Sequence, residues 1–413
     1  MKKGIGVEFT AQDKKKRTIY IPQMLEYHSR FLQAAFEKNG YRFGTLHSDK
    51  PPRSDALRYI SNDYCYPSVL IVGQMIEMLR KNENSTDTIA FMEPQAGGSC
   101  RAGNIYHTIV EVVNKLGYEV PVLSLNYRGQ EKHSGFHITP GLVNSAATAV
   151  CCGDLLMMLY QQTKPYERHP GETDRVCRRV EQLIYEKIRR GGCRRTTLYR
   201  TMLEQFKEVE RYEKGSKQCR GIQKVGVAGE IYIKFSSIGN NNLERYLREQ
   251  HCEPYFGGFL NYGIFVADCE KRMTLLEHPG KLPEAGFDRV IALMEHLQKQ
   301  MYRVVWEGGI YTTDFLFSEL KAKVDGIIST DCVSGDGWLV AAEVVQAIEK
   351  GAKTVLIVHP FGCLVSHVCE RGILRRLKER YKDVSIQTIE YDYDSSDTLR
   401  ESRILMALQT NGG

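Results

Sequence analysis

Residues 353–393 read KTVLIVHPFGCLVSHVCERGILRRLKERYKDVSIQTIEYDY. The run TVLIVH is a short apolar stretch that ends at Pro360 and Gly362, as a buried strand does. ERGILRRLKERY, at 370–381, has apolar residues at helical spacing, and VSIQTIEYDY, at 384–393, is rich in β-formers. Strand, helix and strand in this order predict a βαβ unit, whose two strands lie parallel in one sheet.

The same alternation extends along both halves of the chain. In the first half it predicts strands at 18–23, 88–94 and 120–126 and helices at 25–40, 68–81 and 105–117. In the second half it predicts strands at 224–235 and 325–330 and helices at 241–250 and 338–351. A helical, charged connector separates the halves. We therefore expect an α/β protein with two Rossmann-like lobes, at 1–140 and 225–413, joined by a connector at 141–224.

Length and composition indicate an intracellular protein with more than one core. The chain has 413 residues, of which 42% are hydrophobic and 26% charged. Its N-terminus, MKKGIGVEFTAQDKKKR, lacks the apolar segment of a signal peptide, and no apolar run approaches the roughly 20 residues of a membrane helix. We expect a cytoplasmic location without a membrane. There, 12 cysteines favour reduced thiols and metal ligation over disulfides.

The net charge is +6, and much of the positive excess lies between Lys164 and Lys224. Nucleic acid binding is one interpretation of such a stretch. However, acidic residues such as Glu181, Glu186 and Glu204 alternate with the basic ones at helical spacing. This pattern is typical of a solvated, salt-bridged helix face, so we predict no nucleic acid partner.

Three cysteines each lie in a Gly- or Pro-marked turn after a strand-like run. Cys65 lies in NDYCYP, Cys100 in GGSCRAGN and Cys363 in HPFGC. Open α/β sheets bind ligands at the carboxyl ends of their strands, and thiolates are the ligands of iron clusters. The pattern predicts one shared iron–sulfur site. Each turn also has a structural explanation, because free cysteines are often small buried hydrophobes.

Several segments, taken in order, resemble a known family. They are FTAQDKKKRTIYIPQMLEYHSRFL (9–32), RYISNDYCYPSVLIVGQMIEML (58–79), GGSCRAGNIYHTIVEVV (97–113), GEIYIKFSSIGNNNLERYL (229–247) and VHPFGCLVSHVCERGILRRLKERY (358–381). The chain resembles the cluster-bearing C-terminal region of acyl-CoA dehydratase activase-related proteins, relatives of 2-hydroxyacyl-CoA dehydratase and benzoyl-CoA reductase subunits. The ATP-binding module of the larger relatives has no counterpart here, since the sequence has no GxxxxGK[ST] motif.

The resemblance implies a cofactor and its ligands. Cys65, Cys100 and Cys363 match family motifs that are taken to hold a [4Fe-4S] cluster, with one iron left open to a substrate oxygen or small ligand. Around them the chain departs from the family, because Val365 and Ser366 replace a proline and an asparagine. The resemblance further implies a separate ATP-dependent activase or other low-potential electron donor, an acyl-CoA substrate and assembly into homo- or hetero-oligomers.

Four further residues are candidates for binding the cofactor. Arg101 adds positive charge beside Cys100, which lowers the pKa of a thiol. Asn240 and Asn241 stand at a helix start that, by resemblance, faces the crevice, although asparagine there also caps a helix. His359, before Pro360, could donate to a cluster sulfur, or it could be a satisfied buried histidine.

Other polar residues have more ordinary interpretations. Cys332 and Cys369 could be additional ligands, but neither matches a family position. The adjacent Cys151 and Cys152 lie in an apolar helical run, which favours core packing. Asp336, in GDGW, could transfer protons, but a helix cap is the favoured interpretation.

These observations favour low-potential electron transfer or reductive chemistry on an acyl-CoA. One alternative is a non-catalytic iron–sulfur carrier or activase partner without a CoA pocket. Another is a metal-free structural or regulatory α/β protein. A deep cavity beside the three cysteines supports an enzyme, whereas a shallow, exposed site supports a carrier.

Overall fold

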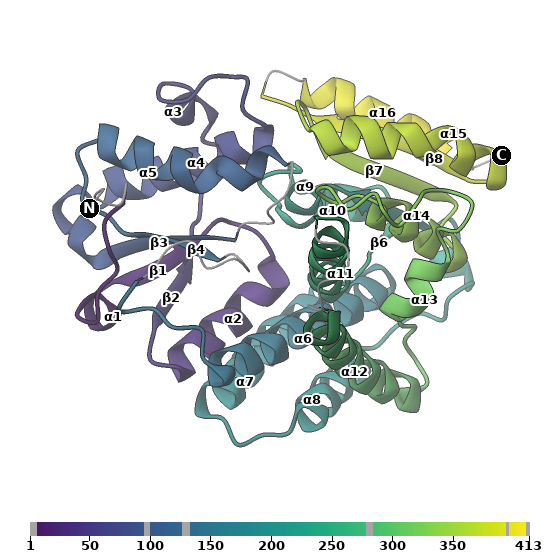
Figure 1. Cartoon of the computed structure of the whole chain (residues 1–413). Helices are drawn as coiled ribbons and strands as arrows, with labels where there is room; N and C mark the ends of the chain where they lie inside the picture. Colours follow the sequence, from purple (N-terminus) through teal and green to yellow (C-terminus); the bar gives the residue numbers. More distant parts are fainter. Residues whose placement is uncertain (1–5, 95–99, 126–132, 278–283, 394–395, 410–413) are drawn as a thin grey trace.

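The first lobe is built on a four-stranded parallel sheet. The computed structural model describes residues 6–94, 100–125, 133–277, 284–393 and 396–409 (Figure 1). The strands lie in the order β2-β1-β3-β4. Their bounds are β1 Thr18–Ile21, β2 Arg42–Thr45, β3 Ile89–Pro94 and β4 Val122–Leu125. The helices of this lobe are α1 Asp13–Lys16, α2 Glu26–Lys38, α3 Arg53–Ala56, α4 Tyr66–Lys81, η1 Glu83–Thr88, η2 Arg101–Asn104 and α5 Ile105–Lys115.

The second lobe repeats this architecture, with the order β6-β5-β7-β8 and all neighbours parallel. Its strands are β5 Gln223–Gly229, β6 Cys252–Phe256, β7 Thr354–Pro360 and β8 Ser385–Tyr391. Its helices are α9 Ile231–Phe235, α10 Leu243–Glu249, α11 Phe259–Glu277, α12 Glu284–Gly308, α13 Phe317–Ala322, α14 Leu339–Glu349, η5 Ser366–Glu370, α15 Arg371–Arg380 and α16 Asp397–Gln409. The α/β fold with two parallel sheets, consistent with two Rossmann-like lobes, is thus confirmed. Every residue of β7 is buried, which explains its continuous apolar run.

Helices connect the two sheets. They are α6 Pro140–Thr163, η3 Lys164–Tyr166, α7 Glu172–Arg190, α8 Arg195–Lys207 and η4 Lys217–Cys219. In Figure 1 the teal helices α6, α7 and α8 lie below both lobes, beside α12. Their apolar residues share one core with α2 of the first lobe and α14 of the second. The connector therefore packs against both lobes instead of standing apart from them.

The expectation that no apolar run has the length of a membrane helix is wrong for α6. Within the described residues, Pro140–Tyr166 is long and apolar enough by length and composition, with a mean hydropathy of 1.6 in its most apolar window. Two thirds of that window is buried inside the protein, which is typical of a core helix. Cys151 and Cys152 on α6 are completely buried in the shared core, so their packing interpretation is confirmed.

Two predictions in the second lobe are wrong. Residues 325–330 form turns instead of a strand, because the N–H groups of Ile327 and Ile328 both donate to the Val324 carbonyl. The position beside β5 is taken by β6, which the sequence did not predict. The strand predicted over 224–235 ends at Gly229, because the Glu230 carboxylate accepts the N–H of Ile233 at 2.8 Å and so caps α9.

Candidate functional site

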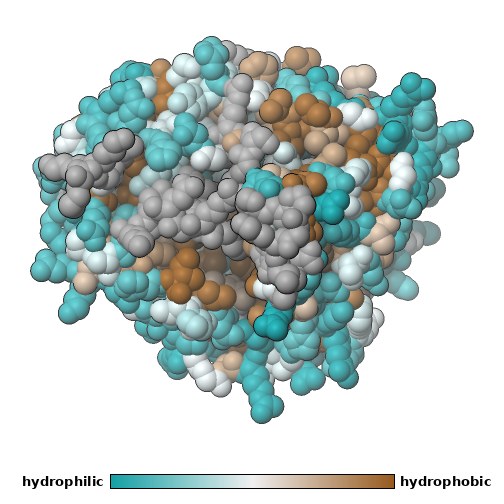
Figure 2. Space-filling view, in the orientation of Figure 1, coloured by the Kyte–Doolittle hydropathy of each residue, from teal (hydrophilic) through white to brown (hydrophobic). Residues whose placement is uncertain are grey.

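A cavity of about 430 Å³ lies between the two lobes, where strands of both sheets end. Its lining includes residues at or just beyond the carboxyl ends of β1, β3, β4, β5 and β7. This is the location at which open α/β sheets bind ligands. The walls are mainly apolar, formed by Ile21, Met24, Leu25, Ile71, Ile105, Leu125, Ile138, Phe259, Tyr262, Val266, Leu364 and Val365. Figure 2 shows apolar residues around a hollow near the centre of one face.

Cys65, Cys100 and Cys363 all line this cavity. Cys65 is the residue before α4, Cys100 follows β3 directly before η2, and Cys363 follows β7. The expectation that each turn follows a strand is wrong for Cys65, because α3 and a further loop separate it from β2. Folding nevertheless brings three segments that are distant in sequence, two from the first lobe and one from the second, to a single cavity.

The three cysteines do not form a compact site for a single metal ion. Among the residues that the structure describes, no group of three or more His, Cys, Asp or Glu side chains could hold such an ion. A cluster is wider than one ion, because its thiolates bind different iron atoms. The common cavity thus agrees with the predicted grouping, and the cluster itself stays a prediction.

A serine three residues further on contacts the sulfur in two of the three turns. The Ser68 hydroxyl lies 3.1 Å from Cys65 Sγ, and the Ser366 hydroxyl donates to Cys363 Sγ at the same distance. The backbone N–H of Ser366 also points at this sulfur, at 3.4 Å. Hydrogen bonds to sulfur stabilise a thiolate and tune the potential of a bound cluster. In the absence of a cluster, burial raises the pKa of the Cys363 thiol, and the Ser366 hydrogen bonds oppose this shift. The repeated Cys-x-x-Ser spacing was the sequence signal for this feature, and the sequence reasoning missed it.

Three carboxyl groups, on Glu93, Glu230 and Asp336, also line the cavity. Burial raises the pKa of Glu93 to about 8 and that of Glu230 to about 7. The pKa of Asp336 lies well above its usual range, first because of burial and then because the Glu230 carboxyl is near. Glu370, also buried, has its pKa raised to about 8 by burial. At neutral pH the cavity thus contains carboxyl groups that hold protons.

Glu93 and Glu230 were not predicted as site residues. Each follows the apolar part of a strand directly, in AFME and GVAGE, and this position was the only signal available. Glu93 Oε2 has no hydrogen-bond partner among the described residues. A buried carboxyl oxygen without a partner is costly, so it indicates a position where a proton or a ligand group is expected.

Comparison with known proteins gives no match. No protein-family model, curated protein or solved structure is similar enough to be assigned to this chain. The site is therefore interpreted from its own residues.

Four other residues were predicted to bind the cofactor. Of these, Asn240, Asn241 and His359 do not line the cavity. The side chain of Arg101 lies outside the described part of the structure. Asn240 Oδ1 accepts the N–H of Leu243 at 3.0 Å, which confirms the capping interpretation for this residue. The Asn241 side chain donates to Asp397 Oδ1 at 2.7 Å. Both asparagines are thus engaged in contacts within the fold.

His359 is completely buried on β7 and does not line the cavity. Burial lowers its pKa to about 4, so the ring is neutral at neutral pH. Glu390 Oε2 lies 3.9 Å from its Nδ1, beyond hydrogen-bond distance. His359 therefore has a neutral, buried ring that does not contact the cavity.

Three further residues were considered as site residues from the sequence, namely Cys332, Cys369 and Asp336. Neither Cys332 nor Cys369 lines the cavity, and the pKa of Cys369 is raised to about 11 by burial and by the nearby Cys332 thiol. The expectation that Asp336 caps the following helix is wrong. Trp338 stands at the cap of α14, which has no side-chain cap hydrogen bond. The Asp336 carboxyl faces the cavity instead.

Glu93→Gln should make the stability of the iron-free protein less sensitive to rising pH between about 4.5 and 8. The folded state holds a proton on Glu93 that the unfolded chain releases above its ordinary pKa of 4.5, so this group costs stability as the pH rises towards 8. The loss is about 1.4 kcal/mol in the free energy of unfolding for each pH unit in that window. Glutamine stays neutral and removes this slope. Urea unfolding between these pH values measures it.

Glu111→Gln is the control for this prediction, since Glu111 is exposed and pairs with Lys115 at 2.7 Å. It should leave the pH slope of the free energy unchanged. Identical slopes for Glu93→Gln and the unsubstituted protein would show that Glu93 is not protonated in the fold.

Proposed function

We propose that the cavity holds one [4Fe-4S] cluster on Cys65, Cys100 and Cys363, and that the protein serves low-potential electron transfer or reductive chemistry on an acyl-CoA. A separate ATP-dependent activase is the proposed electron donor. The observation that carries the proposal is the position of the three cysteines, which come from both lobes and line one cavity at the strand ends. The resemblance of their turns to family motifs identifies the class of chemistry.

The residues present are suitable for such a cluster. Three thiols provide three ligands, and the Ser68 and Ser366 hydroxyls contact two of the sulfurs. Apolar walls exclude water and favour a bound group of low net charge. A bound cluster supplies one-electron chemistry at low potential and, with three protein ligands, one iron that is open to a substrate oxygen.

The chain's own carboxyl groups add a second element. Glu93 and Glu230 hold protons inside the cavity near neutral pH, because burial disfavours their charged forms. A group with a pKa near the working pH is well suited to donate and recover a proton. We assign to these two carboxyl groups the supply of protons to a substrate that gains electrons in the cavity.

The volume of the cavity and the burial of part of its lining favour an enzyme over an electron carrier. Cys65 and Glu93 are each only 6% exposed, and a volume of about 430 Å³ lies within the range of small-molecule pockets. A carrier needs only a cluster near the surface. The carrier without a CoA pocket remains the second candidate, and a metal-free protein is the third.

Titration with acyl-CoA thioesters separates these candidates. The anaerobic protein, once iron and sulfide analysis has established the cluster, should change its electron paramagnetic resonance spectrum on addition of an acyl-CoA. Ile138→Trp, at an exposed position that lines the cavity, should weaken this response about tenfold or more by narrowing the entrance. Leu276→Trp is the control, because Leu276 is similarly exposed on α11 but does not line the cavity.

Each outcome selects one candidate. A cluster that does not respond to any acyl-CoA thioester, in a protein that still accepts electrons, would favour the carrier. A protein without iron after anaerobic preparation would favour the metal-free alternative.

A further inference from the structure

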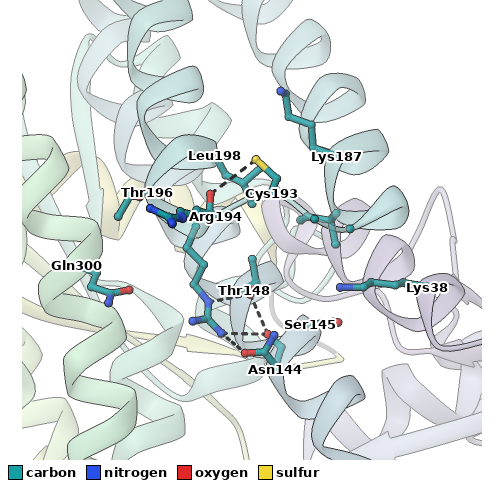
Figure 3. A pocket seen from close by; sticks show the side chains of 14 residues that line it. Lys38, Asn144, Ser145, Thr148, Lys187, Cys193, Arg194, Thr196, Leu198 and Gln300 are labelled. Carbon is teal, nitrogen blue, oxygen red and sulfur yellow. Dashed lines mark hydrogen bonds between the residues drawn. The ribbon is translucent and has the colours of Figure 1, made fainter.

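A second pocket, of about 360 Å³, lies where α7 turns into α8. We call it the α7–α8 pocket. Figure 3 shows its side chains coming from α2, α6, α7, α8 and α12, around the turn GGCRR at 191–195. Four of the lining residues are basic, namely Lys38, Lys187, Arg194 and Arg195, and no aspartate or glutamate lines the pocket.

Three of these basic residues, Lys187, Arg194 and Arg195, belong to the connector, whereas Lys38 is the last residue of α2. Residues 164–224 contain 17 Lys and Arg but only 9 Asp and Glu. Many of the bases there are in ion pairs, such as Arg179 with Glu208 at 2.8 Å and Arg200 with Glu307 at 3.3 Å. The salt-bridged helix face predicted from the sequence is thus present. The four pocket residues form no ion pair with a carboxylate in the described part of the chain, and no acidic residue lines the pocket, so part of the excess positive charge lies there unbalanced.

The contacts of Arg195 hold its charge in the pocket without neutralising it. Arg195 Nε donates to the Thr148 hydroxyl at 2.8 Å, and the same guanidinium contacts the Asn144 side chain. Both partners are uncharged. Figure 3 shows the Lys38 ammonium pointing toward this group from α2, while Lys187 stands farther out along α7. These contacts thus orient one cation, and Lys38, Lys187 and Arg194 add further positive charge to the pocket lining.

The backbone adds donors at the same place. α8 begins at Arg195, and Arg194 before it makes no side-chain cap hydrogen bond. The first N–H groups of a helix lack partners within the helix and carry its positive dipole end. Gly191 and Gly192 have φ angles of 74° and 78°, and a side chain at Gly192 would meet nothing within 4 Å. The turn therefore leaves space beside the helix start.

We propose that the α7–α8 pocket binds a small phosphorylated molecule through its phosphoryl group. Like charges gathered without counter-charges repel one another, and a phosphoryl group with two negative charges removes this cost. Guanidinium groups and helix N-termini both match phosphate oxygens in geometry. The pocket is distinct from the cysteine-lined cavity in its lining residues, so this inference does not depend on the proposed cluster.

Calorimetric titration of the full chain tests the proposal with inorganic phosphate, pyrophosphate and glucose 6-phosphate as probes. We expect at least one probe to bind, and Arg194→Ala to weaken its binding about tenfold, as expected for a lost charge-assisted hydrogen bond. Arg200→Ala is the matched control, because it removes the same charge from α8 at a residue that is paired with Glu307 and does not line the pocket. Arg195→Lys, which keeps the charge but loses the forked geometry, should also weaken binding.

A second readout uses Cys193, which lines the pocket and is partly exposed. Its alkylation by iodoacetamide, followed by peptide mass spectrometry, should slow when the bound probe is present. Tightest binding of glucose 6-phosphate would assign the site to organic monoesters, and tightest binding of pyrophosphate would assign it to inorganic diphosphate. Absence of binding by all three probes, an equal loss in Arg200→Ala, or displacement of the probe by duplex DNA would overturn the proposal.

Discussion

Cys100→Ser should leave the anaerobically prepared protein almost without iron, whereas Cys151→Ser should keep the content of the unsubstituted chain, about four iron atoms for a [4Fe-4S] cluster. Cys100 lines the cavity between the lobes, and Cys151 is completely buried in the core of α6. A serine hydroxyl is a poor substitute for a thiolate that binds iron. Iron and acid-labile sulfide analysis measures the difference.

Cys65→Ser and Cys363→Ser should resemble Cys100→Ser, because the three thiols are proposed to share one cluster. The brown anaerobic protein should also bleach in air, as oxygen-sensitive clusters do. Circular dichroism of each variant checks that the fold is kept. Equal iron content in Cys100→Ser and Cys151→Ser would place the ligands elsewhere in the chain.

Reduction of the cluster should need a separate activase together with ATP. The sequence contains no Walker-type phosphate loop, so this chain should not hydrolyse ATP by itself. Electron transfer requires the donor to approach the cluster. Two exposed apolar residues, Ile138 and Leu364, belong to the cavity lining and mark the side from which a donor can approach.

The connector should make this reduction sensitive to salt. Residues 164–224 carry an excess of positive charge, which speeds the encounter with an acidic partner at low ionic strength. Spectroscopic assays with a purified activase should show rates that fall as salt is added. Reduction that proceeds equally well without the activase or without ATP would contradict this prediction. An unchanged rate at high salt would show that the connector does not take part in docking of the activase.

The predictable part of the fold was the part encoded by local pattern. β7, α15 and β8 follow the apolar run at 354–360 and the periodic segments after it, and most helices of the first lobe follow the same rules. The errors lie where tertiary packing, and not the local sequence pattern, determines the secondary structure. Residues 325–330 have the composition of a strand but form turns, and β6, which the sequence did not predict, lies beside β5 in the sheet. α6 is apolar because it lies in the core that both lobes share.

The candidate site also contains residues that could be predicted from the sequence and residues that could not. The cysteines could be found from their turns, since the Gly and Pro residues beside them are visible in the sequence, but the strand expected before Cys65 is absent. Glu93, Glu230 and Asp336 become site residues only when both sheets bring their ends together, and no spacing along the chain records that proximity. The raised pKa values of these groups come from burial, which is a property of the folded protein.

The cavity takes its walls from both lobes, with Cys65 and Cys100 on one side and Cys363 on the other. An occupant that binds all three cysteines must therefore link the two lobes to each other. Such an occupant can be inserted only after both halves of the chain have folded, and it would resist the bending of one lobe away from the other. Insertion of the occupant and the loss of movement between the two lobes would then occur together.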